Sequence, residues 1–489
     1  MVKNFIKDMI KYLPAHIIPA IVSIISTPII TRFFSPEAYG NYSLAMAVVM
    51  ILTTLSGWLS MSIIRFYPVY ELEKKLGIFY GNVVNLMFIS SAVITIAFLI
   101  FVFCIKQYIS PTLRTLMYLG VGVFIVYAIF EVFQSFLRAK RQINQYSGFA
   151  IWKSMMGFGL GIALVILFKF GIEALLWGAI LSIVIISPLL WKMSIRDIKF
   201  VQFQINYSLL KKMVTYSFPL VIGNLAAWIL SLSDRYFLEF FRGAREVGIY
   251  SAGYNIAEKS IMVLFSLFAL ASGPISMQIW ERDGVDKAKE YESKLARYYL
   301  MVCIPAVAGL SALSKPVIAI LTGVQYHDAY KIISFITLGV LFLGLQSFFQ
   351  IGFLFYKRTG FVTFAISISG LLNMCLNFIF IPKYGYMAAA LTTLFSYIFL
   401  FILMVFTSRR IFSWKFPFKS LIKISCATAI MGTVVYFIGK GLTSVIWINL
   451  AVGIFIGGLV YFLALLWLRE FNSQEKKAIK QFFRCSTSI

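Results

Sequence analysis

The sequence predicts an all-α polytopic membrane protein of about 14 transmembrane helices, arranged as two six-helix lobes and a C-terminal helical pair. The first observation is composition, because 60% of the 489 residues are hydrophobic and only 13% are charged. A soluble protein of several domains does not have this composition. The second is the length of the apolar runs, about 18 to 25 residues each, which fits helices. The strands of a membrane barrel would give alternating segments of about ten residues instead.

The first lobe, residues 1–212, contains six predicted spans. Span 1 is interrupted by Pro14, Pro19 and Pro28 and has no small-residue cleavage site before Arg32, so we expect a retained signal-anchor helix. A short turn within residues 168–174 must divide the fifth span from the sixth. The six spans lie near residues 10–31, 41–64, 78–105, 115–137, 147–168 and 172–191.

The second lobe, residues 213–412, contains six more spans, and residues 413–489 form the extra helical pair and a cytoplasmic tail. The least distinct boundary lies within residues 381–390, where a turn must separate two apolar runs. The eight spans lie near residues 213–233, 247–279, 298–320, 332–356, 361–381, 385–407, 420–439 and 444–468.

The basic residues indicate orientation rather than a nucleic-acid partner. The net charge is +25, yet the 44 Lys and Arg residues are spread along the whole chain. With both termini in the cytoplasm, 31 of them lie on the cytoplasmic side, 11 on the outer side and two, Lys153 and Lys259, within spans. This asymmetry follows the positive-inside rule. The five cysteines have neither a disulfide framework nor metal-ligand spacing, so we predict no metal and no cofactor.

An internal repeat relates the first pair of spans in each lobe. Span 1 leads through a short outer loop into "GNYSLA" at residues 40–45, and span 7 leads through a similar loop into "GIYSAG" at residues 248–253. A proline near the start of each span and an interfacial arginine, Arg32 or Arg235, accompany the motif. Six spans separate the copies, so both run in the same direction. Parallel repeats of this kind are typical of alternating-access transporters.

Polar residues on spans 1, 2, 7 and 8 suggest a central cavity. In span 8, Ser251, Asn255 and Glu258 recur at intervals of three and four residues, which places them on one helix face. Span 7 contributes Asn224, and Arg65 lies at the inner end of span 2. The alternative is that such Ser, Thr and Asn residues hydrogen-bond neighbouring helices.

Two acid-base combinations within spans need an explanation, because a charge at the bilayer centre costs about 2.5 to 3.5 kcal/mol. Glu258 and Lys259 are adjacent and point about 100° apart on a helix. We therefore expect them to pair poorly with each other and to need water or a partner on another helix. Glu131 and Lys153 reach the same depth on antiparallel spans 4 and 5, which favours a structural salt bridge. The functional alternative is that Lys153 faces the cavity as an anion contact, while Glu131 holds it or takes a proton when the bridge opens.

Three stretches resemble a known family: "YLPAHIIPAIVSIISTPIITRFFSPEAYGNYSLAMA", "YSFPLVIGNLAAWILSLSDRYFLEFFRGAREVGIYSAGYNIAEK" and "SGPISMQIWERDG". They resemble the polysaccharide transporter family of the multidrug, oligosaccharidyl-lipid and polysaccharide exporter superfamily, especially its Wzx-type O-antigen repeat-unit flippases. The resemblance implies a V of two lobes in the bacterial inner membrane. It also implies translocation of an undecaprenyl-diphosphate-linked oligosaccharide to the periplasmic leaflet, with polysaccharide polymerase or chain-length machinery as further partners.

The resemblance also implies a cationic cavity that suits a diphosphate. Related lipid flippases carry arginines in span 1, where this sequence has only His16, so their diphosphate site does not transfer residue by residue. The candidates for substrate binding are Lys259, Lys153, Arg65, Arg235, Asn255 and Asn224, and those for proton coupling are Glu258 and Glu131.

Two other functions compete with a flippase. A multidrug exporter of the same superfamily would favour an acidic cavity, whereas lysine matches glutamate in mid-span here. A membrane enzyme of polysaccharide assembly, such as a polymerase or ligase, needs catalytic residues on a sizeable outer loop. The longest outer connector has roughly 14 residues, 233–246, so we do not expect an enzyme.

Overall fold

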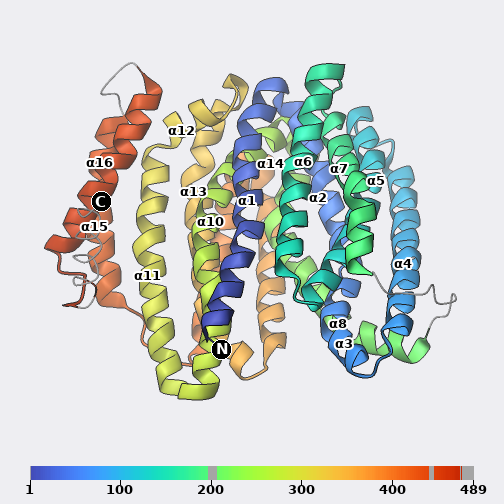
Figure 1. The fold of residues 1–489 in the computed structure, drawn as a ribbon. Helices are drawn as coiled ribbons and strands as arrows, with labels where there is room; N and C mark the ends of the chain where they lie inside the picture. Colours follow the sequence, from blue (N-terminus) through green and yellow to red (C-terminus); the bar gives the residue numbers. More distant parts are fainter. Residues whose placement is uncertain (1, 196–205, 440–444, 474, 476–489) are drawn as a thin grey trace, which may run out of the picture. The chain divides into compact units, whose positions relative to one another are not determined.

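The chain is helical almost throughout the residues that the computed structural model describes, which are 2–195, 206–439, 445–473 and 475 (Figure 1). The structure divides it into two compact units. Unit 1 comprises residues 1–255 and 359–396, and unit 2 comprises residues 256–358 and 397–489. Each unit is described separately below.

Unit 1 holds the first nine helices, the start of α10 (Ala244–Asp283) and most of α14 (Thr359–Ser408). Within it, α6 packs against α1 and α7, and α5 packs against α2, α3 and α7. The nine helices are α1 (Val2–Phe33), α2 (Pro36–Ser56), α3 (Trp58–Leu72), α4 (Leu76–Ile105), α5 (Pro111–Ala139), α6 (Ile143–Phe168), α7 (Glu173–Ser194), α8 (Tyr207–Leu232) and α9 (Asp234–Arg242).

Local sequence sets where several of these helices begin. The Ser35 hydroxyl accepts a hydrogen bond from the Ala38 N–H at 3.3 Å, and Ser110 accepts one from the Leu113 N–H at 3.1 Å. In both cases a proline follows the cap as the first helical residue. A serine cap accepts a hydrogen bond from a backbone N–H that has no partner within the helix. Proline costs no helical hydrogen bond at the first position, because an N–H there would have no partner within the helix. The sequence therefore sets the residues at which α2 and α5 begin.

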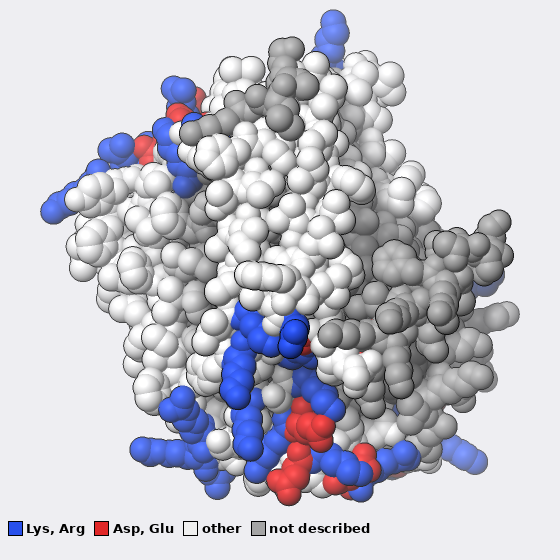
Figure 2. Space-filling model, turned by 90° about the vertical axis from the view of Figure 1, so that its left-hand side faces the viewer, with Lys and Arg blue, Asp and Glu red and all other residues white. Residues whose placement is uncertain are grey.

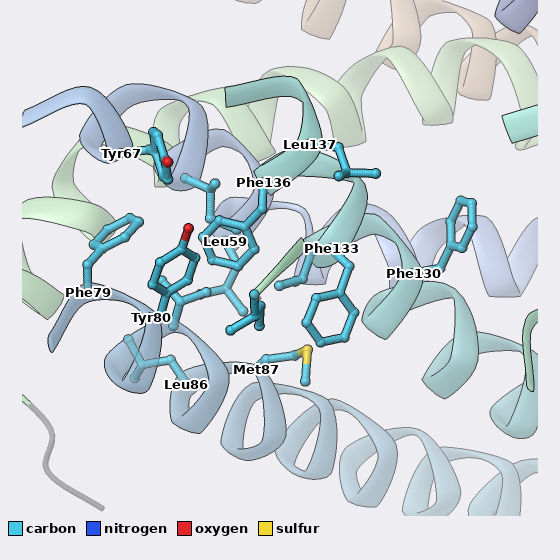
Figure 3. Close-up of a cluster of buried hydrophobic side chains, with 14 of the residues drawn as sticks. Leu59, Tyr67, Phe79, Tyr80, Leu86, Met87, Phe130, Phe133, Phe136 and Leu137 are labelled. Carbon is cyan, nitrogen blue, oxygen red and sulfur yellow. The ribbon is translucent and has the colours of Figure 1, made fainter. Parts of the chain in front are cut away.

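An aromatic core holds the end of α3, the start of α4 and the end of α5 together in unit 1 (Figure 3). The rings of Tyr80 and Phe136 lie 4.8 Å apart, and Phe79 meets Phe136 edge to face at 6.3 Å. Such ring pairs contribute about 0.5 to 1.5 kcal/mol beyond the area that they bury. The core keeps α5 in a fixed position, and α5 carries Glu131.

Unit 2 consists of the remaining parts of α10 and α14 with six further elements. Here α11 packs against α13 and α15, and α15 packs against α16. Trp280 stacks on Phe355 at 4.6 Å and meets Phe412 at 5.9 Å. The elements are α11 (Val285–Ala312), α12 (Ser314–Leu321), the 3₁₀ helix η1 (Val324–Ala329), α13 (Tyr330–Phe355), α15 (Phe418–Gly439) and α16 (Ile446–Trp467).

Helix α14 is two helices joined by a sharp turn. Gly385 has φ of +57° and ψ of −141°, which interrupts the helix, and Pro382 lies just before it. The Thr392 hydroxyl donates a hydrogen bond to the Asn377 side chain, 15 residues earlier. A straight helix would separate those residues by about 22 Å, because each residue adds 1.5 Å. The chain therefore folds back at Gly385, where the sequence predicts a boundary.

The described residues include 13 helices that are long and apolar enough to cross a membrane. One of them is α14, whose two arms supply two spans, so the predicted 14 are all found. The predicted turn at residues 168–174 is confirmed, since α6 ends at Phe168 and α7 begins at Glu173. The chain is a multi-pass membrane protein. The two lobes predicted from the repeat stay a prediction, because the compact units group the helices differently.

Candidate functional site

A polar cavity of about 460 Å³ lies inside unit 1, between α1, α2, α5, α6 and α7. Its volume falls within the range of ordinary small-molecule sites. Charged, amide, hydroxyl and aromatic side chains line it together, which is unusual inside an apolar helical protein. The polar and aromatic lining residues are Ser23, Ser26, Tyr42, Tyr127, Phe130, Glu131, Gln134, Tyr146, Lys153, Ser154 and Phe158.

Lys153 and Glu131 form the charged part of this cavity. The Lys153 Nζ atom donates a hydrogen bond to Glu131 Oε1 at 3.2 Å, which confirms the predicted salt bridge. The same ammonium group lies 3.9 Å from the centre of the Tyr127 ring and 4.9 Å from that of Phe130. A ring face attracts a cation, and more strongly where water is excluded. The Lys153 side chain is 22% exposed, whereas that of Glu131 is 52% exposed.

Neutral polar groups complete the lining. The Gln134 amide donates a hydrogen bond to the Tyr146 carbonyl at 3.3 Å. Its buried Oε1 atom has no hydrogen-bond partner among the described residues. A buried acceptor without a partner costs about 1 to 3 kcal/mol, so such a group calls for water or a ligand with a donor. The cavity therefore offers one cation, one anion and a free acceptor at the same place.

Sequence reasoning missed Gln134 and Tyr127, although a signal was present. Tyr127, Glu131 and Gln134 are spaced by four and three residues, so they share one face of α5. Extending the face of Glu131 by one turn in each direction predicts both. The polar residues from which the sequence predicts a cavity lie on spans 1, 2, 7 and 8 instead. The structure lines the cavity with α1 and α2 from that set, and adds α5, α6 and α7.

The repeat motif has a structural role in unit 1, where α2 crosses the start of α10. The Ser43 hydroxyl donates to the Ser251 hydroxyl at 2.8 Å, and these residues are equivalent in the two copies. A Cβ atom on Gly40 would overlap the Ala244 carbonyl, and one on Gly248 would overlap the carbonyl of Pro36. Only glycine permits so close an approach. The two copies therefore contact each other through matching residues.

Asn255 lies beside this crossing rather than in the cavity. Its side-chain amide donates a hydrogen bond to the Tyr39 hydroxyl at 2.8 Å. This bond between helices is the structural alternative considered for such residues. Asn224 is exposed on α8 and Arg65 is exposed on α3, and neither lines the cavity.

Arg235 is buried instead of anchoring at the membrane interface, so that expectation is wrong. It is 3% exposed and donates to Asp234 Oδ1 at 3.2 Å, and Asp234 is 1% exposed. The Arg235 guanidinium also lies 4.7 Å from the Tyr254 ring. Burial raises the pKa of Asp234, while Arg235 and a hydrogen bond from Tyr250 oppose the rise. A partner so close in sequence lets both charges leave water together.

Glu258 and Lys259 also differ from expectation, because they pair with each other. The Lys259 Nζ atom lies 3.1 Å from Glu258 Oε2 in unit 2. Adjacent residues do diverge on a helix, but two long flexible side chains can turn back and meet. The cavity therefore brings together Lys153 and Glu131, and the remaining predicted site residues lie elsewhere.

Residues 5–280 match the family described as polysaccharide biosynthesis protein. The chain belongs to this family. Among the relatives of this chain, an uncharacterised membrane protein of Methanocaldococcus jannaschii is 25% identical over 86% of this chain and 87% of its own. The probable low-salt glycan biosynthesis flippase Agl15 of Haloferax volcanii is 23% identical over 51% of this chain and 53% of its own. The succinoglycan biosynthesis transport protein ExoT of Rhizobium meliloti is 22% identical over 64% and 62%.

Solved structures share the fold of this chain. The lipid II flippase MurJ, in an inward closed conformation, has a TM-score of 0.76 at 21% identity, covering 94% of this chain and 99% of its own. An inward-facing multidrug resistance MATE family transporter of the MOP superfamily has a TM-score of 0.66 at 14% identity, covering 82% and 94%. The predicted all-α exporter fold and the family are thereby confirmed.

Proposed function

We propose that this protein is a flippase for a polyprenyl-diphosphate-linked oligosaccharide, with undecaprenyl as the carrier, and that Lys153 contacts the diphosphate. The observation that carries the proposal is a lysine held in a polar cavity, among apolar helices, in a polysaccharide biosynthesis protein. Similarity to a probable glycan flippase, a succinoglycan transport protein and a lipid II flippase supports the proposal. The protein moves its substrate without making or breaking a covalent bond.

Charge exchange is the physical basis of the proposed binding. Without substrate, the half-exposed Glu131 neutralises Lys153 at 3.2 Å. A diphosphate has more negative charge than one carboxylate, so it can replace Glu131 as the partner of the ammonium group. The rings of Tyr127 and Phe130 keep the ammonium group in place during the exchange. Glu131 then turns to solvent or takes a proton, which is one route to coupling with a proton gradient.

The neutral polar groups suit a sugar. Gln134 Oε1 can accept a hydroxyl hydrogen, and Ser23, Ser154 and Tyr42 add further hydroxyl groups. A polyprenyl chain can remain in hydrocarbon without a free-energy cost, because only the head group must leave water. Alternating access would then carry the head group from the cytoplasmic to the outer leaflet of the inner membrane. Both termini remain cytoplasmic in this scheme.

Replacing the lysine tests the proposal. In liposomes containing a fluorescent polyprenyl-diphosphate oligosaccharide, we expect Lys153→Gln to lower the flipping rate at least about tenfold, equal to about 1.4 kcal/mol. Lys192→Gln is the matched control, because Lys192 is exposed at the end of α7 and does not line the cavity. Equal rates for the two variants would remove Lys153 from the site.

A second candidate, export of a cationic amphiphile, is favoured by one observation. The Glu131 side chain is more exposed than that of Lys153, at 52% against 22%, so a cation meets the carboxylate first. The two functions predict opposite results for Glu131→Gln. Export of a cation would be lost, whereas binding of the anionic lipid would strengthen, because Lys153 would lose its competing partner.

A further inference from the structure

A second cavity, of about 420 Å³, lies in unit 2 and shares no residue with the first. It is formed by α11, α13, the last part of α14 and the connector of residues 409–417. Its walls are almost wholly apolar and aromatic. The wall residues that matter below are Ile402, Phe406, Arg409, Trp414, Phe416 and Phe418.

Exposed apolar side chains form part of the cavity wall. Ile402, Phe406 and Phe418 line it and are 44%, 63% and 61% exposed. Exposed apolar residues beside an apolar cavity let a flexible hydrocarbon chain enter from the bilayer without crossing water. Deeper in the wall, the Phe349 ring lies 4.8 Å from that of Trp414 and 5.7 Å from that of Phe401.

Trp414 and Arg409 add a hydrogen-bond donor and a cation to the cavity wall. Trp414 is 8% exposed, and its indole N–H has no hydrogen-bond partner within the part of the chain that the structure describes. A buried Trp N–H usually has one, so this position calls for an acceptor. Arg409 also lines the cavity, and its guanidinium lies 5.8 Å from the Phe406 ring. It forms no ion pair with a carboxylate among the described residues.

Further basic residues lie near Arg409 in the sequence. Arg410, Lys415 and Lys419 are exposed on the same connector and at the start of α15. Figure 2, which views the side of Figure 1 where α15 and α16 are drawn, shows Lys and Arg gathered at the lower end of a broad uncharged band. The positive-inside rule places residues 409–419 on the cytoplasmic side, where anionic lipid head groups attract basic residues.

We propose that this cavity binds an anionic glycerophospholipid of the cytoplasmic leaflet. One acyl chain fills the apolar cavity, and the phosphate and ester oxygens meet Arg409 and the Trp414 N–H. The occupant differs from the transported lipid, because its head group stays at the membrane surface while the cargo's head group must enter the polar cavity of unit 1. The lipid adds contacts to the connector between α14 and α15, whose Trp414 already packs against Phe349.

Lipid titration of the purified full-length protein tests the proposal. By native mass spectrometry, we expect retained dioleoyl-phosphatidylglycerol and little dioleoyl-phosphatidylcholine, since the two differ only in head group. Arg409→Gln should weaken phosphatidylglycerol retention about fivefold, as expected for one basic residue near an anionic surface. Lys315→Gln is the control, because Lys315 is exposed on α12 of the same unit, lies outside residues 409–419 and does not line the cavity.

Fluorescence quenching tests where the acyl chain lies. Bromine atoms on an acyl chain quench only tryptophans that they approach closely. We expect brominated phosphatidylglycerol to quench more than brominated phosphatidylcholine, and Trp414→Phe to remove that difference. Trp467→Phe should leave the difference intact, because Trp467 is 77% exposed at the end of α16 and meets any lipid. Phenylalanine preserves the ring packing at position 414, so the variant tests the indole rather than the fold.

Three results would overturn the inference. One is equal retention of the two lipids by the unaltered protein. Another is equal weakening by Arg409→Gln and Lys315→Gln. The third is displacement of phosphatidylglycerol by undecaprenyl phosphate, which would assign the cavity to the carrier lipid. Flipping that fails in Lys153→Gln while lipid retention persists would keep this site separate from the proposed transport site.

Discussion

Three cations on the helices lie close to groups that offset their charge. Lys153 combines a carboxylate with the rings of Tyr127 and Phe130. Arg235 combines a buried carboxylate with the rings of Tyr250 and Tyr254. Lys259 has only its own neighbour, Glu258. Of the three cations, Lys153 is the one that lines the polar cavity of unit 1. This difference in surroundings, rather than charge or depth, is what singles it out as a site.

A fourth cluster, near the C-terminus, links the chain after α16 to α11 in unit 2. Arg297 donates to Glu470 Oε1 and to Glu475 Oε1, each at 2.7 Å. The Tyr298 hydroxyl also donates to Glu475 Oε1 at 2.7 Å. Burial alone would raise the pKa of Glu475, but hydrogen bonds from Arg297, Tyr298 and the Asn472 N–H, with the charge of Arg297, lower it to about 2.

The lowered pKa predicts a pH-dependent contribution to stability. A carboxyl whose pKa is lower in the folded state stabilises the fold above its unfolded pKa of 4.5 and loses that effect as the pH falls toward 2. We expect Glu475→Gln to lower the free energy of unfolding at pH 7 by about 2 kcal/mol, because charged hydrogen bonds are lost. A lower thermal midpoint measures this loss. The difference from the unaltered protein should shrink at pH 3. A constant difference between pH 7 and pH 3 would contradict this account.

At the scale of elements, pairs of helices are held by close approach at small residues. The crossing of α2 and α10 depends on Gly40 and Gly248, which meet Ala244 and Pro36 respectively. Gly40 and Gly248 occupy equivalent positions in the two copies of the repeat, and each allows the backbone of the other helix to approach closely. The Ser43 to Ser251 hydrogen bond then adds a polar contact at the same place.

Adding one methyl group at this crossing should separate the helices. We expect Gly248→Ala to cost about 1 to 3 kcal/mol of stability, because the new carbon would overlap the Pro36 carbonyl. Gly159→Ala is the control, since a Cβ atom there meets no other atom within 4 Å, and alanine favours a helix by about 0.5 to 1 kcal/mol. Thermal midpoints in detergent compare the two. Equal midpoints would mean that the helices do not approach so closely.

At the scale of the whole molecule, orientation follows from the distribution of Lys and Arg. The connector between α10 and α11 then lies in the cytoplasm, and η1 lies outside. Asp283 and Val324 are both exposed, so each can be replaced by cysteine and labelled. Both lie in unit 2, so the comparison concerns one body.

Labelling of intact cells checks this orientation. With the five native cysteines replaced, we expect a membrane-impermeant maleimide to modify Val324→Cys in intact cells. Asp283→Cys should react only after the cells are opened, because positive charge retains its connector on the cytoplasmic side. Lysis also serves as the control that both thiols can react. The reverse pattern would invert the predicted topology and move the proposed phospholipid site to the other leaflet.

The sequence by itself determined the helical class, the spans and the pairing of Glu131 with Lys153. Membrane insertion is nearly a sum over consecutive residues, so hydropathy and turn residues suffice to find the spans, including the fold at Gly385. Only the tertiary structure decided that Arg235 is buried, that Glu258 meets Lys259, and that Gln134 and Tyr127 join the site. Those outcomes depend on which helix faces pack together and how long side chains turn, and packing joins residues far apart in the chain.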